Sequence, residues 1–347
     1  MIKNIFLFAL SIFISFLFIE LCFINFFPQE KNDSWRVQGR NGVYFNIKNK
    51  KAKHEFFGKK DKISVEYNFG NFANRILVNK KQKNQNKILL MGDSFIFGWL
   101  VEDSDTIQNK LQNYFTDFEV INGSAGGFSD SDQLIYLKEF CDEIKPEYII
   151  FFTEIDRNFR NKIFQLGKNN ELIEGQIQKN KLKEKLNSST IYHFFSRNFH
   201  FFNFLKKQYV KNKSNLKINP KTNLEKDNKN DLFNQDEKHE KQIILTKLIF
   251  QEIIKETKLC KSKIFFVNIY WFKKSGYSKI KNYVYENFNE FIKNEEEILY
   301  TNLENEMNIL LDNRNYFFYE EGHPNKYGTN IISEILIAKF KKFNLQN

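Results

Sequence analysis

Residues 88–99 read ILLMGDSFIFGW, a short apolar run that ends in a Gly92-Asp93-Ser94 step and is followed at once by aromatic residues. Apolar residues at consecutive positions are typical of a strand that is covered on both faces. The step after this strand has two interpretations. It is either an ordinary tight turn or the presentation of a nucleophilic serine at the edge of a sheet.

The surrounding sequence alternates between apolar runs and amphipathic segments. Four apolar runs are predicted strands: KILLM (87–91), FEVIN (118–122), YIIFF (148–152) and IFFVNIYW (264–271). Apolar residues at helical spacing predict helices at 107–115, 134–144, 240–258 and 283–311. A short strand is also expected within 315–328, followed by a closing helix. This alternation predicts an α/β fold with a mainly parallel sheet, in which functional groups gather beyond the carboxyl ends of the strands.

Composition allows a sizeable core and excludes several classes of function. The 347 residues are 41% hydrophobic and 17% aromatic, enough for one large domain or two ordinary ones. The net charge is +11, but the lysines are scattered among many acids, so we expect a solvated surface and no nucleic-acid partner. No metal, phosphate-loop or dinucleotide motif is present, and no cofactor is expected. A Cys141–Cys260 disulfide is conceivable, but the cysteines leave the compartment open.

The N-terminus is strongly apolar from residue 5 to residue 27. A helix of this length measures about 34 Å, which is enough to cross a hydrocarbon core. A cleaved signal is the alternative, but the Ile19-Glu20-Leu21-Cys22 flank lacks the small residues of a cleavage site, so an uncleaved membrane anchor is favoured. Lys3 and the basic residues after the anchor give opposing orientation signals. Because N-terminal anchors commonly export the domain attached to them, the main domain is expected outside the cytoplasm.

These observations predict three regions along the chain. Residues 1–28 are the membrane anchor, 29–86 a polar lead-in and 87–345 the main domain. A Lys/Asn-rich insertion interrupts the main domain at about 162–240. Within this insertion, the aromatic segment 191–205 is expected to be a core helix, with a lid or a membrane-touching helix as the alternatives.

Two residues in the main domain suit nucleophilic catalysis. Ser94 directly follows the first predicted strand, and His323 precedes the closing helix. An imidazole near neutral pH can take the proton of a serine, provided that a carboxylate fixes its tautomer. Glu320, three residues before His323, is the predicted carboxylate, and Glu321 is the second candidate.

At these positions the chain resembles the SGNH hydrolases, also called GDSL-type esterases and lipases. Four blocks carry the resemblance, in the order and spacing of the family: MGDSFIFGW (91–99), INGSAGGFSDSDQL (121–134), IIFFTEIDRN (149–158) and YEEGHPNKYG (319–328). They lie within about 85–165 and 240–340. The resemblance implies an α/β/α sandwich with a flavodoxin-like parallel sheet. It also implies that Ser94 is the nucleophile, His323 the base and Glu320, in place of the usual Asp, its orienting acid.

The chain departs from the family where the oxyanion is bound. Ser124 stands at the second-block position whose backbone N–H is an oxyanion donor in the family. Ile155 stands where the third block usually has an asparagine donor, and losing one such donor typically costs about a hundred- to a thousandfold in rate. Asn158 is a tentative replacement, and Asn122 is another.

The sequence therefore predicts a membrane-anchored hydrolase that cleaves carboxylic esters through an acyl-enzyme on Ser94. The resemblance permits cell-envelope carbohydrate or lipid esters as substrates. Two alternatives stay open. An O-acyltransferase would use the same residues, and the replacement at Ile155 is compatible with a non-catalytic binding protein on the same fold.

Overall fold

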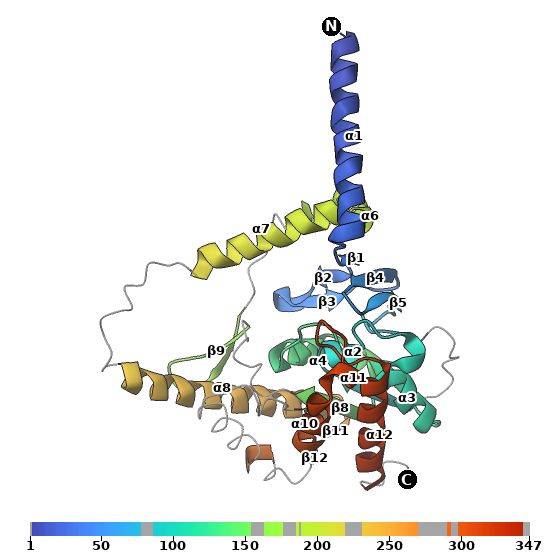
Figure 1. Cartoon of the computed structure of the whole chain (residues 1–347). Helices are drawn as coiled ribbons and strands as arrows, with labels where there is room; N and C mark the ends of the chain where they lie inside the picture. Colours follow the sequence, from blue (N-terminus) through green and yellow to red (C-terminus); the bar gives the residue numbers. More distant parts are fainter. Residues whose placement is uncertain are drawn as a thin grey trace. The chain divides into compact units, whose positions relative to one another are not determined.

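The computed structural model describes residues 2–77, 86–153, 163–175, 185–186, 189–218, 231–269, 290–292 and 298–342. These form two compact units, each assembled from distant segments (Figure 1). The N-terminal unit comprises Met1–Ser34, Ala52–Glu66 and Asn180–Asn228. The sheet unit comprises Trp35–Lys51, Tyr67–Lys179 and Lys229–Asn347. The predicted lead-in and insertion are thus each divided between the two units.

The sheet unit is built on five parallel strands in the order β12-β11-β8-β6-β7. Their bounds are Lys87–Met91 for β6, Glu119–Asn122 for β7, Tyr148–Thr153 for β8, Lys263–Asn268 for β11 and Leu299–Asn302 for β12. The first of these strands along the chain, β6, lies between the second and the third. This flavodoxin-like order confirms the predicted α/β fold, and it places a topological switch point beside the carboxyl end of β6.

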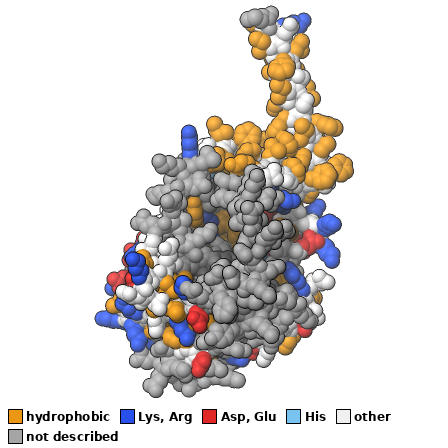
Figure 2. All heavy atoms as spheres, turned by 90° about the vertical axis from the view of Figure 1, so that its left-hand side faces the viewer, with side chains coloured by type: hydrophobic (Ala, Val, Ile, Leu, Met, Phe, Trp, Pro, Cys, Tyr) orange, Lys and Arg blue, Asp and Glu red, His pale blue; other side chains and the backbone are white. Residues whose placement is uncertain are grey.

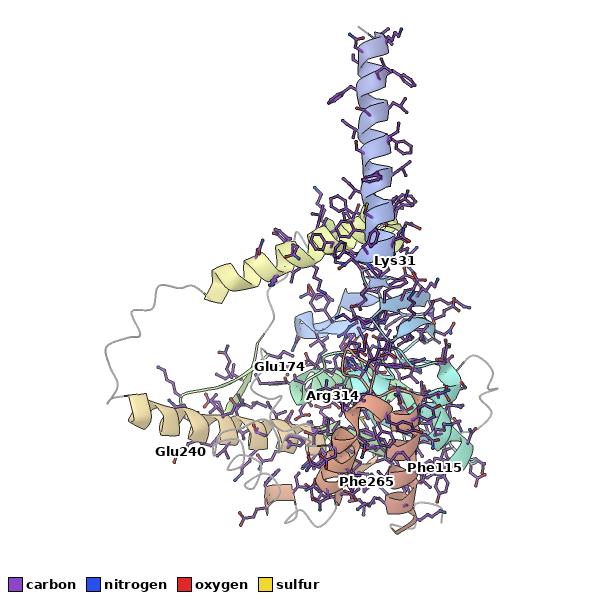
Figure 3. The ribbon with its side chains drawn as sticks, in the orientation of Figure 1. Lys31, Phe115, Glu174, Glu240, Phe265 and Arg314 are labelled. Atoms are coloured by element: carbon purple, nitrogen blue, oxygen red, sulfur yellow. A yellow bond between two sulfur atoms is a disulfide. The ribbon has the colours of Figure 1, made fainter. Side chains whose placement is uncertain are left out.

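Helices cover both faces of this sheet, as the predicted α/β/α sandwich requires. On one face, Leu89, Phe151 and their neighbours pack against α4 (Asp130–Ile144) and α8 (Asp231–Leu259). On the other, Leu90 and Ile150 pack against α3 (Ile107–Tyr114), α10 (Glu304–Asp312) and α12 (Lys326–Lys342). The Phe115 and Phe265 side chains lie in this second layer, and both contact the Phe340 ring (Figure 3). Each fully buried side chain of this size stabilises the fold by about 1.5–3 kcal/mol.

Smaller elements surround the sheet. An antiparallel hairpin of β2 (Arg36–Gln38) and β3 (Tyr44–Asn46) encloses the 3-10 turn η1 (Arg40–Gly42). A second hairpin, β9 (Phe164–Leu166) and β10 (Leu172–Glu174), packs on α8. The short helix α2 (Ser94–Phe97) follows β6, and the 3-10 turn η2 (Asp103–Asp105) precedes α3.

Two secondary-structure predictions near the C-terminus are wrong. In the described part of the predicted helix 283–311, residues 299–302 form β12, and α10 begins only at Glu304. The strand expected within 315–328 is replaced by the short helix α11 (Arg314–Phe317) and one bridge between Phe318 and Pro324. β12 is a strand because it pairs with β11, and this pairing leaves no signal in the local periodicity.

A disulfide joins Cys141 on α4 to Cys260, which directly follows α8. The two Cα atoms are 6.0 Å apart and the residues are separated by 119 positions. The bridge therefore ties together the two helices that cover one face of the sheet.

Replacing both cysteines by alanine is expected to lower the free energy of unfolding by about 2–5 kcal/mol, because the bridge closes a long loop in the unfolded chain. Urea unfolding of the full chain in detergent measures the difference. Reductant should destabilise the wild type to a similar extent and leave the double variant unchanged. Equal stability of the two oxidised proteins would show that the bridge is dispensable.

The N-terminal unit begins with the helix α1 (Ile2–Phe26), which is long and apolar enough to span a membrane, although a signal sequence has the same properties. The unit also contains the sheet β1 (Lys31–Asn32), β4 (Lys51–Phe57) and β5 (Lys62–Asn68), in which β1 and β4 are antiparallel. The helices α6 (Thr190–Asn198) and α7 (His200–Ile218) complete it. Figure 2 shows hydrophobic side chains covering α1 and gathering around its base.

The prediction of a core helix at 191–205 is wrong. This segment forms α6 and the first part of α7, and both helices belong to the N-terminal unit. Its phenylalanines contact the rings of Phe16 and Phe23 on α1. The segment therefore packs within the N-terminal unit through these phenylalanines.

Candidate active site

The Gly92-Asp93-Ser94 step is a tight turn that presents a serine. A Cβ atom on Gly92 would lie 2.5 Å from Ile96 Cγ1, so no larger side chain fits where β6 meets α2. Asp93 caps α2, because its Oδ1 accepts the Phe95 N–H at 2.8 Å. Ser94 is consequently the first residue of α2, just beyond the carboxyl end of β6. The step is therefore a tight turn, and the same turn places Ser94 at the sheet edge.

His323 lies in a tight loop between α11 and α12. The Gly322 N–H donates to the Tyr319 carbonyl at 3.0 Å, and the Tyr319 N–H donates to the His323 carbonyl at 2.9 Å. Gly322 has a φ of 103°, a conformation that favours glycine. Asn325 Oδ1 accepts the Tyr327 N–H at 2.9 Å and so caps α12. These bonds hold the imidazole at a defined position.

The structure brings Ser94 and His323 together as the sequence predicted. His323 Nε2 lies 2.8 Å from Ser94 Oγ, although 229 residues separate them. Glu321 supplies the carboxylate that contacts the other ring nitrogen, His323 Nδ1. The sequence predicted Glu320 for this position. A carboxylate at neutral pH only accepts hydrogen bonds, so Nδ1 carries the proton and Nε2 is left to accept from Ser94.

The turn at Gly322 explains why Glu321 takes this place. The left-handed backbone at Gly322 folds the chain back on itself, so that the side chain two positions before the histidine reaches Nδ1. Glu321 Oε1 also accepts the His323 backbone N–H at 3.4 Å. Sequence spacing alone does not reveal the handedness of this turn, which decides between the two adjacent glutamates.

Two aromatic rings contact the imidazole and were not singled out from the sequence. Trp99 stacks on His323 with ring centroids 5.6 Å apart and an interplanar angle of 27°. Phe95 meets it edge-on at 5.4 Å. Both residues belong to the aromatic run directly after Ser94, and that run was the only available signal. The imidazole is therefore confined by packing as well as by hydrogen bonds.

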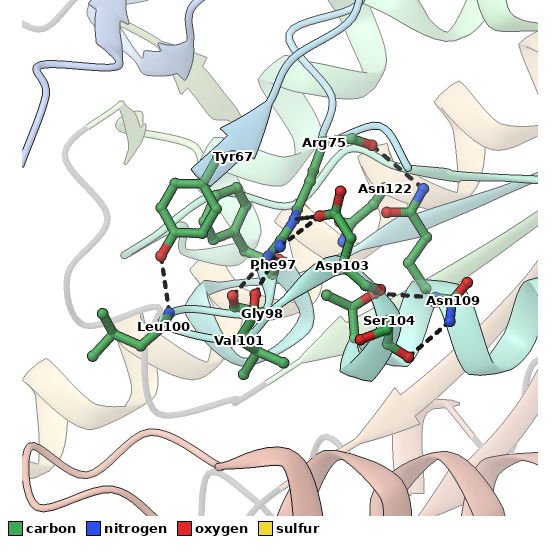
Figure 4. Close-up of polar contacts among 12 residues, drawn as sticks. Tyr67, Arg75, Phe97, Gly98, Leu100, Val101, Asp103, Ser104, Asn109 and Asn122 are labelled. Atoms are coloured by element: carbon green, nitrogen blue, oxygen red, sulfur yellow. Dashed lines mark hydrogen bonds and ion pairs between the residues drawn. The ribbon is translucent and has the colours of Figure 1, made fainter. Parts of the chain in front are cut away.

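Arg75 holds the segment that carries Trp99 (Figure 4). Its side chain is fully buried, and it donates to four acceptors on this segment: the carbonyls of Phe97, Gly98 and Val101 at 2.7–3.0 Å, and Asp103 Oδ1 at 2.8 Å. The guanidinium also lies 4.8 Å from the centre of the Tyr67 ring, whose hydroxyl accepts the Leu100 N–H at 2.9 Å. This cluster fixes the backbone from 97 to 103 beside the imidazole.

Replacing Arg75 by methionine is expected to lower the free energy of unfolding by about 2–5 kcal/mol, because buried carbonyls and Asp103 lose their donor at once. Urea unfolding measures the loss. The matched control is Arg40→Met, since Arg40 is exposed and its change is expected to cost about 0.5 kcal/mol or less. Similar losses in both variants would mean that the Arg75 cluster contributes no special stability.

The backbone N–H that the sequence assigns to the oxyanion already has a partner. The Ser124 N–H donates to Asn122 Oδ1 at 3.1 Å, and Asn122 Nδ2 donates to the Ile96 carbonyl at 2.8 Å. To bind an oxyanion, the Ser124 N–H has either to give up its hydrogen bond to Asn122 Oδ1 or to donate to Oδ1 and the oxyanion at the same time. The predicted side-chain donor, Asn158, lies outside the described residues, as does Ile155.

The β2–β3 hairpin braces the loop that contains Ser124. Asn46 Nδ2 donates to the Ser124 carbonyl at 3.2 Å, and the Arg36 guanidinium donates to the carbonyls of Gly126 and Tyr44. Burial lowers the pKa of Arg36 to about 10, an effect that the nearby Asp132 opposes, so Arg36 is charged at neutral pH. Part of the predicted lead-in thus supports the site.

Within the described residues, no group of three or more His, Cys, Asp or Glu side chains could hold a metal ion. What the site offers is a hydroxyl, an imidazole and a carboxylate in a hydrogen-bonded series, at the topological switch point of a parallel sheet. In strand order and in the order of these residues along the chain, the protein resembles the SGNH hydrolases.

No protein-family model and no curated protein sequence matches the chain. Similar solved structures include the psychrotrophic esterase EstA from Pseudoalteromonas sp., with 13% identity over 76% of this chain and 100% of that one, at a TM-score of 0.45. TesA matches with 11% identity over 74% of this chain and 99% of that one, at a TM-score of 0.43. Axe2, an acetylxylan esterase from Geobacillus stearothermophilus, matches with 13% identity over 75% of this chain and 96% of that one, at a TM-score of 0.40. At these values the likenesses carry no inference about activity, and the assignment of the fold rests on strand order.

Proposed function

We propose that this protein is a membrane-anchored serine hydrolase that cleaves carboxylic esters. The observation that carries the proposal is the hydrogen-bonded series from Ser94 Oγ through the His323 imidazole to the Glu321 carboxylate. A serine hydroxyl is a weak nucleophile unless a base within hydrogen-bond reach takes its proton. Here the base lies 2.8 Å away, and its second nitrogen contacts an acceptor that stabilises the imidazolium when it forms.

In the proposed reaction, Ser94 Oγ attacks the ester carbonyl carbon while its proton passes to His323 Nε2. The tetrahedral intermediate collapses, and the same proton goes from Nε2 to the leaving alcohol. Water then attacks the acyl group on Ser94, with His323 again acting as base, and the free acid leaves. The proposed oxyanion donors are the backbone N–H groups of Ser94 and Ser124 and the side chain of Asn158.

The proposed location is the extracytoplasmic face of a membrane, with α1 as the uncleaved anchor. The Cys141–Cys260 bridge supports this location, since disulfides persist in oxidising compartments and are rare in the cytosol. Esters on carbohydrates or lipids of the cell envelope are the substrates proposed for a site at this location.

Labelling of the full chain with a fluorophosphonate tests the proposal. We expect one adduct, and peptide mapping should place it on Ser94. The protein in detergent should also hydrolyse an activated acetate ester, and loss of this activity should follow the extent of labelling. An added sugar alcohol that captures the acetyl group would indicate transfer in place of hydrolysis. Folded protein that neither labels nor turns over would contradict an enzyme and favour a binding function.

A further inference from the structure

The helix α1 is covered mainly along one stripe. Among its described residues, Phe16, Glu20, Cys22 and Phe23 have reduced exposure, and Glu20 is 6% exposed. Phe16, Glu20 and Phe23 follow one another at spacings of four and three, so they share one face of the helix. Large apolar side chains elsewhere on the helix are exposed, including Phe8, Phe13 and Phe18. Most of the covered surface of α1 therefore lies on this face, and Cys22 lies outside it.

The residues that cover this stripe are Phe199, directly after α6, and phenylalanines in the first turns of α7. The Phe199 ring lies 5.1 Å from that of Phe16, and the rings of Phe201 and Phe204 lie 5.3 and 5.0 Å from that of Phe23. These contacts occur within the N-terminal unit, where Figure 1 shows α6 and α7 at the base of α1. Phenylalanine is thus the main contact residue on both sides.

The Glu20 side chain joins α7 to α1 through two hydrogen bonds. Its Oε1 accepts the His200 N–H at 2.7 Å, and its Oε2 accepts the Phe201 N–H at 2.9 Å. These are donors of the first turn of α7, which have no partner within their own helix. The carboxylate also faces the positive end of the helix dipole. One side chain of α1 therefore satisfies two backbone groups that would be costly to leave unpaired in lipid.

The position of these contacts along α1 sets their depth in a membrane. Crossing a hydrocarbon core takes about 20 helical residues. Every placement of a span of that length within Ile2–Phe26 includes both Phe16 and Glu20. This step rests on the proposed anchoring by α1. If α1 spans the bilayer, residues 199–201 have to lie within the bilayer or at its boundary.

The outer surfaces of α6 and α7 suit such a position. Ile191 and Phe194 on α6, and Leu205, Tyr209 and Val210 on α7, are exposed although apolar or amphipathic. The two helices contain one arginine and five lysines but no Asp or Glu. Long lysine side chains can bury their stems in lipid while their ammonium groups reach the phosphate level. A polar, basic and aromatic composition of this kind is typical of helices that lie in the membrane interface.

We propose that α6 and α7 form an interfacial helix pair embedded in the leaflet at the C-terminal end of α1, with Glu20 as the intramembrane clamp that joins the pair to the span. The occupant of their exposed apolar surface is the lipid bilayer. The anchor is thus a three-helix element, in which the chain leaves the membrane after α1 and returns to it some 160 residues later.

Site-specific fluorescence on the full chain tests this arrangement. In a Cys22→Ser background, the variants Phe194→Cys and Leu205→Cys report on the helix pair. Leu17→Cys reports on the span, and the exposed Lys62→Cys on β5 is the aqueous control. Each is labelled with an environment-sensitive dye and reconstituted in vesicles of phosphatidylcholine and phosphatidylglycerol. Nitroxide-labelled lipids should quench the Phe194 and Leu205 probes nearly as strongly as the Leu17 probe, and several-fold more than the Lys62 probe.

The outcomes separate this inference from the anchoring on which it rests. Quenching of the Leu17 probe alone, with Phe194 and Leu205 resembling Lys62, overturns the helix pair and leaves the anchor standing. Absence of quenching at Leu17 overturns the anchor and, with it, the helix pair.

The clamp has its own test in amide hydrogen exchange of the reconstituted protein. Glu20→Leu keeps α1 apolar but removes both acceptors, so exchange of the His200 and Phe201 amides should rise by about tenfold or more. Quenching at Leu17 should not change, which shows that the span is still inserted. Exchange at wild-type rates in the inserted variant would overturn the role of Glu20.

Discussion

Replacing Ser94 by alanine is expected to lower kcat/KM for an activated acetate ester by at least about 10³-fold, since removal of a nucleophile leaves only what binding and the oxyanion donors provide. The fluorophosphonate adduct should disappear in the same variant. The Ser94 hydroxyl is the group that His323 Nε2 faces at 2.8 Å, so alanine removes the bond-forming atom and leaves the imidazole in place. Progress curves in detergent, with the full chain at equal concentration, measure the loss.

Ser124→Ala is the matched control for Ser94→Ala. Ser124 is also buried, and among the described residues no hydrogen-bond partner reaches its hydroxyl. Alanine keeps the backbone N–H that the proposed oxyanion site needs, so activity should stay within a few-fold of wild type. Equal activity in wild type and Ser94→Ala, with Ser94 unlabelled, would refute the serine mechanism.

Replacing Glu321 by glutamine is expected to lower kcat by about 10²- to 10⁴-fold, whereas Glu320→Gln should change it only a few-fold. The Glu321 carboxylate contacts His323 Nδ1 and is the negative charge that stabilises the imidazolium. A glutamine amide is neutral, and when its NH₂ faces Nδ1 it places the ring proton on Nε2, where it blocks acceptance from Ser94. Steady-state kinetics over a range of ester concentrations separates this loss in kcat from a change in KM.

The two adjacent glutamates make this a controlled comparison, because both variants make the same chemical change one residue apart. Thermal unfolding of both proteins shows whether either has lost its fold. A large loss in Glu320→Gln with an active Glu321→Gln would instead favour the assignment made from sequence spacing. It would mean that the loop rearranges before catalysis.

Much of the fold can be predicted from local sequence patterns. KILLM and YIIFF are apolar at almost every position, which is typical of a strand covered on both faces, and both lie in the sheet as β6 and β8. The resemblance to SGNH hydrolases added the flavodoxin-like order, which periodicity alone does not provide. Patterns were least informative where pairing decides the structure, as in β12, whose four residues become a strand through contact with β11.

By itself, the sequence determined four of the five strands of the central sheet, the apolar N-terminal helix and the pairing of Ser94 with His323, because these depend on residue type, run length and order along the chain. Only the tertiary structure decided that Glu321 reaches Nδ1, that Trp99 and Arg75 hold the site, and that Phe199 and α7 pack on α1. Each of these depends on where a turn directs a side chain or on which distant segment covers an apolar face. Such information lies in three-dimensional contacts and has no counterpart in local periodicity.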